Sequence, residues 1–161
     1  MSTTGKLKPC GFSLLTLAPS ANPGELGATR HAKGAGPQPE EVITMEATIN
    51  ERAMQAIGAY LERKGFEILE NGWAHGTDRV DFIAREEDDL VFVLAEVTED
   101  RGDGFPSEEF DRAALERVAA AYLAQADGDA DYAVRFDFVS MIVIGDSRAF
   151  LRHHRNCLSE A

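Results

Sequence analysis

The apolar residues of the chain recur with two kinds of spacing, which together predict alternating helices and strands. Helical spacing is found over residues 53–61 and again over residues 110–123. Segments of alternating or continuous apolar character, typical of strands, are residues 66–70, 79–85, 90–98 and 134–144. The elements therefore follow one another in the order αβββαβ.

This order predicts a small α/β sandwich with a mixed sheet. The charged connection over residues 86–89 is short, so it indicates a hairpin between the second and third strands. The second helix joins the third strand to the fourth, which favours a parallel crossover. Thr48 and Glu51 have the spacing of a capping box, so we expect the first helix to begin at Thr48. We expect the second helix to begin with the proline, serine and acidic residues of 106–109.

The beginning of the chain differs in composition from the rest. Residues 1–44 are rich in Gly, Pro, Ala, Ser and Thr, so we predict a disordered extension there, a folded domain over 45–155 and a tail over 156–161. Met45 as the start of translation is an alternative. Lys6 and Lys8 precede a short apolar stretch, as in a signal peptide, but Gly, Ser and Thr dilute that stretch, and we expect a cytoplasmic protein. No apolar run approaches membrane-spanning length, and we expect no membrane partner.

Two carboxylates lie on the predicted hairpin, Asp81 on its first strand and Glu96 on its second. Residues two apart on a strand share a face, so Glu96 and Thr98 lie together. If the register brings Asp81 beside Glu96, the pair offers the oxygen ligands that Mg²⁺ prefers, and the ion could activate water to attack a phosphodiester. The alternative is that both acids are solvent-facing residues of an acidic hairpin.

From residue 50 to residue 150 the chain resembles the YraN family, uncharacterised bacterial proteins similar to Holliday-junction resolvases of the PD-(D/E)XK nuclease superfamily. The residues that carry the resemblance are 50–53, 60, 61, 64–66, 78–84, 90–93, 96, 97, 119, 122, 123 and 135–139. It implies a restriction-endonuclease-like fold and a Mg²⁺ or Mn²⁺ ion held by Asp81 and Glu96. It also implies that Glu51 is a candidate third acid, although the capping role competes with that one. Structured or single-stranded DNA is the implied substrate, and a homodimer is the arrangement that junction cleavage requires.

The chain departs from the family pattern at the positions closest to the chemistry. Thr98 occupies the usual lysine position, and a hydroxyl cannot replace an ammonium beside a scissile phosphate. Arg79 occupies the position of a glutamate, and we expect it to face away from Asp81. Leu94 and Ala95 resemble an insertion before Glu96. We therefore expect nuclease activity to be weak or absent.

The formal charge of the chain is −12, which repels a polyanion on average. A local basic patch could still serve DNA, and the best candidates are Arg148, Arg152, His153, His154 and Arg155. The alternative for these residues is a frayed polar tail. Two functions thus remain open: a metal-dependent endonuclease, and a catalytically inactive nuclease-fold module that binds protein partners.

Overall fold

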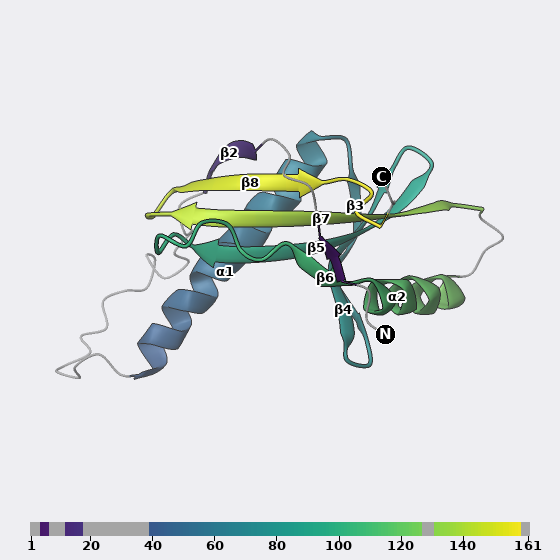
Figure 1. The fold of residues 1–161 in the computed structure, drawn as a ribbon, viewed down its shortest axis with the longest axis horizontal. Coiled ribbons are helices and arrows are strands. Elements are labelled where there is room, and N and C mark those ends of the chain that lie inside the picture. Colours follow the sequence, from purple (N-terminus) through teal and green to yellow (C-terminus); the bar gives the residue numbers. More distant parts are fainter. Residues whose placement is uncertain (1–3, 7–11, 18–38, 127–130, 159–161) are drawn as a thin grey trace, which may run out of the picture.

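The computed structural model describes residues 4–6, 12–17, 39–126 and 131–158, and it shows a sheet with one helix on each face (Figure 1). The helices are α1 (Pro39–Arg63) and α2 (Arg112–Gln125). The strands are β1 (Thr4–Lys6), β2 (Phe12–Thr16), β3 (Glu67–His75), β4 (Asp78–Glu86), β5 (Asp89–Glu99), β6 (Glu109–Asp111), β7 (Ala133–Ile144) and β8 (Arg148–His154). No helix among the described residues is long and apolar enough to span a membrane.

A six-stranded mixed sheet organises the molecule, with the strand order β2-β8-β7-β5-β4-β3. The β5 and β7 strands are parallel and α2 connects them, whereas the other neighbours in this sheet are antiparallel. The β4–β5 hairpin closes with Glu86 opposite Asp89. The predicted α/β class, the hairpin and the parallel crossover are all confirmed.

The two faces of the sheet carry separate apolar clusters because successive residues of a strand point to opposite sides. On β5, Val91 and Val93 pack with α1, and Leu90 and Phe92 pack with α2. These four side chains are at most 4% exposed, so β5 is the central strand of the fold. This burial on both faces explains the continuous apolar run in its sequence.

Both helices begin elsewhere than predicted. The α1 helix starts at Pro39, so Thr48 lies in its interior and Glu51 has no capping role. The α2 helix starts at Arg112, where the Asp111 side chain accepts hydrogen bonds from the backbone N–H groups of Ala113 and Ala114. Residues 109–111, expected within the helix, instead form β6 and pair with β1.

The N-terminal and C-terminal segments belong to the sheet in places where we expected disorder or a loose tail. The β2 strand pairs with β8, and Leu15 and Leu17 are 8% and 1% exposed in the cluster under α1. Residues 12–17 of the predicted extension thus include an edge strand, and their apolar residues fill one of its faces. Residues 18–38 of that extension lie outside the described residues. At the other end, Cys157 donates its backbone N–H to the Phe136 carbonyl at 2.7 Å, so residues 156–158 are held against β7.

Candidate carboxylate site

The register of the β4–β5 hairpin differs by two residues from the one that would bring the two acids together. The ladder ends with Phe82 opposite Val93, so the next residues, Asp81 and Leu94, lie beside each other. Glu96 is two residues further along and keeps the face of Leu94, because a shift of two preserves the alternation. The β5 strand pairs residue by residue with β7 from Asp89 to Glu99, so the two extra residues sit in regular strand and not in a bulge.

Asp81 lies where the alternation of faces along β4 breaks. Phe82 packs in the cluster under α1, but Val80, two residues earlier, packs in the cluster under α2. The break lies opposite Gly72, whose φ of 69° is in the left-handed region that favours glycine. The predicted first strand, residues 66–70, therefore continues through this kink to His75. The kink turns Asp81 towards α1, where it lines a pocket of about 460 Å³.

The Asp81 carboxylate is half-buried and held by the neighbouring strand. The backbone N–H of Ala95 donates to Oδ2 at 2.7 Å, at the point where the ladder between the two strands has ended. No hydrogen bond from a described group reaches Oδ1. Burial raises the pKa of Asp81, and the Ala95 hydrogen bond and the charge of Arg79 offset only part of that effect.

Glu96 is the second member of the carboxylate pair. Partial burial raises the pKa of its carboxyl group, and the charge of Asp81 raises that pKa further. The charge of Arg79 lowers the pKa of both acids. We expected Arg79 to face away from Asp81, but its charge reaches both carboxylates. The structure brings the two acids within electrostatic reach of each other, with an exposed arginine nearby.

The other predicted site residues, Glu51 and Thr98, do not line the pocket that contains Asp81. Glu51 is exposed on α1 and is not among the groups that shift the pKa of Asp81 or Glu96. Thr98 borders a different pocket, of about 310 Å³, together with Asn50 and Arg101. Within the part of the chain that the structure describes, no group of three or more His, Cys, Asp or Glu residues could hold a metal ion.

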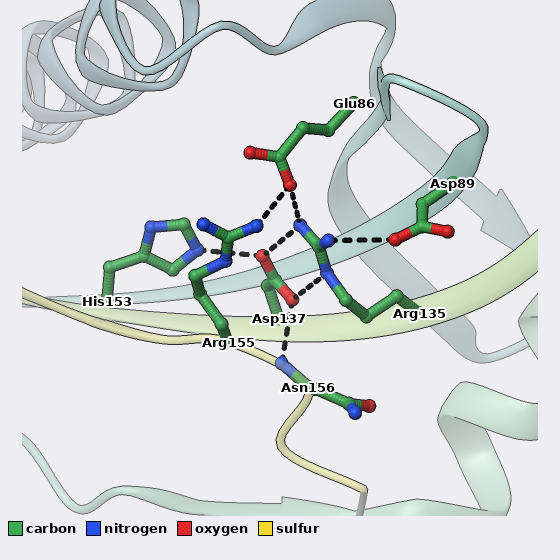
Figure 2. Close-up of polar contacts among 7 residues, drawn as sticks. All are labelled: Glu86, Asp89, Arg135, Asp137, His153, Arg155 and Asn156. Carbon is green, nitrogen blue, oxygen red and sulfur yellow. Dashed lines mark hydrogen bonds and ion pairs between the residues drawn. The ribbon is translucent and has the colours of Figure 1, made fainter.

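A buried ion-pair network at the other end of β5 contains several of the cations that were candidates for a basic patch (Figure 2). Its centre is Asp137, which is 0% exposed. The Asp137 carboxylate contacts Arg135 at 2.9 and 3.2 Å, His153 at 2.8 Å and the Asn156 backbone N–H at 2.9 Å. Burial would raise the pKa of Asp137, but these hydrogen bonds together hold it below its ordinary value. Further ion pairs extend the network: Arg135 also pairs with Glu86 and Asp89, and Arg155 pairs with Glu86.

Two further residues of that cluster are also engaged inside the protein. Arg152 and His154 both contact Glu108, at 3.3 and 3.1 Å, and Ser140 donates a hydrogen bond to the same carboxylate at 2.7 Å. Arg152, His153, His154 and Arg155 are therefore neither a frayed tail nor a free basic patch, whereas Arg148 is exposed at the start of β8. The sequence held one signal of this arrangement, because Arg135 and Asp137 alternate with Phe136 and Phe138 inside an apolar run. Charged residues in such a strand are buried only when they are paired.

Comparison with known proteins places the chain in a family. Residues 53–141 match the family described as "Uncharacterised protein family UPF0102". A UPF0102 protein of Beutenbergia cavernae is 35% identical over an alignment 115 positions long, which covers 65% of this chain and 97% of the relative. A UPF0102 protein of Alkaliphilus metalliredigens is 30% identical over 107 residues, 65% of this chain and 92% of the relative. The resemblance to YraN is thereby confirmed, and the chain belongs to the UPF0102 family.

Proposed function

We propose that this protein is nuclease-like, binds a divalent cation through Asp81 and Glu96, and cleaves DNA weakly or not at all. The observation that carries the proposal is the position of Asp81, whose Oδ2 accepts a hydrogen bond from the Ala95 N–H, one residue before Glu96, and whose charge raises the pKa of Glu96. A divalent cation bound near both carboxylates would offset the repulsion between their charges. Mg²⁺ and Mn²⁺ are the candidate ions, because Mg²⁺ needs only one or two carboxylates when water and phosphate complete its shell.

The surroundings of the pair account for weak cleavage. Leu94, and not a carboxylate, lies beside Asp81 at the end of the ladder, and Thr98 borders a separate pocket. Arg79 is the cation that acts on both acids, and its guanidinium is the group available to stabilise a phosphate. Once bound, the ion would supply an activated water and charge stabilisation for phosphodiester hydrolysis.

Calorimetric titration of Mg²⁺ and Mn²⁺ into the full chain tests the metal site. Asp81→Asn and Glu96→Gln should each abolish binding, and Asp88→Asn in the exposed hairpin turn should leave it unchanged. Binding that survives both substitutions, or no binding in the unmodified protein, refutes the proposed ion site.

Cleavage of a four-way DNA junction and of single-stranded DNA tests the chemistry. Thr98→Lys should raise the rate, because it restores a cation at the family's usual position. Arg79→Ala should lower any basal rate, because it removes the arginine that acts on both carboxylates. An unchanged rate in Thr98→Lys would count against the role assigned to that position.

The second candidate is a catalytically inactive module that binds protein partners in the cytoplasm, alone or as a homodimer. It is favoured by the charge of −12 and by the pairing of the C-terminal cations with Glu86, Glu108 and Asp137. Affinity for DNA that is measurable and falls steeply with salt would contradict it, because such a dependence reports cations neutralising phosphates.

A further inference from the structure

The pocket beside Asp81 is a candidate binding site in its own right. It lies between α1 and the β3–β4 hairpin, and it encloses about 460 Å³. Its lining residues are Met54, Gln55, Gly58, Ala59, Glu62, Ile68, Asn71, Gly72, Asp81 and Phe82. Most of this lining is apolar, and its two ionisable residues are both acids.

The two acids stand on opposite walls of the pocket, Glu62 on α1 and Asp81 on β4. The Ala95 hydrogen bond fixes Oδ2 of Asp81, so the carboxylate has a set orientation and Oδ1 remains to accept from a ligand. A half-buried carboxylate is costly when no cation faces it, and a positively charged group that enters the pocket would remove that cost.

The apolar part of the pocket suits an alkyl chain. Met54 and Ile68 line it from α1 and β3, and Phe82 lines it from β4. Gly58 lies close to the Phe82 ring, because a Cβ built at that position would be in van der Waals contact with Phe82 Cε1 at 3.5 Å, so a larger side chain there would occupy this part of the pocket. Long cationic side chains bind in this manner, with the stem on apolar surface and the charged head on a polar group.

We propose that this pocket receives a lysine or arginine side chain from a basic segment of a partner protein. The stem would pack on Phe82 and Met54, and the ammonium or guanidinium would bind Asp81 with Glu62 as the second acid. The overall charge of −12 attracts such a segment and repels nucleic acid. The inference goes beyond the metal site, since Gly58 and Glu62 are no part of the carboxylate pair.

The test is calorimetric titration of the full chain, in low salt with EDTA, by an acetylated peptide of alternating lysine and alanine. The same peptide with glutamine for lysine is the ligand control, and spermidine is the free-amine comparison. Gly58→Leu fills the pocket from a helical position, and we expect it to lower the affinity for the lysine peptide by about tenfold or more. Ala120→Leu adds an equal side chain at an exposed position on α2 and should leave the affinity unchanged.

Glu62→Gln is the second variant, and it should lower the affinity for the lysine peptide without filling the pocket. The inference is overturned if Gly58→Leu folds, by circular dichroism, and binds the lysine peptide as tightly as the unmodified protein. It is overturned equally if the glutamine peptide binds as well, or if spermidine binds the pocket more tightly than the peptide does. Gly58→Leu should leave Mg²⁺ affinity intact, so failure of the pocket and failure of the metal site give different results.

Discussion

Replacing Asp137 by asparagine removes one charge from the centre of the buried network while preserving the shape of the side chain. The carboxylate receives hydrogen bonds from Arg135, His153 and the Asn156 backbone N–H. An asparagine offers one acceptor oxygen and turns an NH₂ group towards donors that it cannot satisfy. Arg135, whose side chain is 12% exposed, would retain only Glu86 and Asp89.

The size of the effect follows from burial. Removing one partner of a buried ion pair costs about 3–5 kcal/mol, since the remaining charge stays desolvated. The lower end applies here, at about 3 kcal/mol, because Glu86 and Asp89 still neutralise Arg135. For a chain of this length that loss corresponds to a fall in Tm of roughly 6–12 °C.

Urea unfolding at neutral pH measures the loss, with Asp88→Asn in the exposed hairpin turn as the control. The folded-state pKa of Asp137 is lowered, so its contribution is fully present above the unfolded pKa and disappears as the pH falls through the folded pKa. The difference between the unmodified protein and Asp137→Asn should therefore be constant near pH 7 and shrink below about pH 4. A loss below about 1 kcal/mol at pH 7, or one that does not shrink in acid, would refute the reasoning.

Three further substitutions or reactions test other parts of the structure. Leu17→Ala should destabilise the protein by about 3 kcal/mol in urea unfolding, since Leu17 is 1% exposed. Leu14→Ala is the control, because Leu14 is 60% exposed and its loss should cost about 0.5 kcal/mol or less. Equal effects of the two substitutions would contradict the packing of residues 12–17 against the sheet. Burial raises the pKa of Cys157 to about 12, so iodoacetamide should modify it slowly at pH 8 in a Cys10→Ser protein and rapidly in denaturant; equal rates would contradict the burial. Asp81→Asn should leave the free energy of unfolding at pH 7 unchanged or raise it. The pKa of Asp81 is raised in the folded state, so its ionisation costs stability as the pH rises. A loss of more than about 1 kcal/mol in unfolding free energy would show that the carboxylate stabilises the fold.

Local sequence patterns predicted the central part of the fold, because apolar runs marked the strands there and the connections between them indicated how the strands pair. The β4, β5 and β7 strands follow their apolar runs to within a residue or two, and their hairpin and parallel pairing follow from the connections. The helix starts failed because caps compete with tertiary contacts. Glu108 has the sequence of a first-turn acid, but Ser140, Arg152 and His154 hold its carboxylate outside the helix.

Register and long-range pairing were the features that sequence could not supply. The hairpin could be recognised, but the two-residue offset between Asp81 and Glu96 depends on the turn at residues 87–88. The contacts of Asp137 join residues up to 19 positions apart, and those of Glu108 join it to Arg152, 44 positions away, and to His154, further along the chain. No local pattern identifies such partners, so the C-terminal cations resembled a free patch.

The acids of this chain separate into two groups by the direction in which their pKa is shifted. Asp78, Glu108 and Asp137 have lowered pKa values because side chains hydrogen-bond to them: Arg117 to Asp78, Ser140 with His154 and Arg152 to Glu108, and His153 with Arg135 to Asp137. Asp81 and Glu96 have raised pKa values, and they are neighbours at the point where β4 and β5 stop pairing. The first group stabilises the fold. Ionisation of the second group costs the folded state energy, and Asp81 also lines a pocket, which makes this pair the candidate for a functional role.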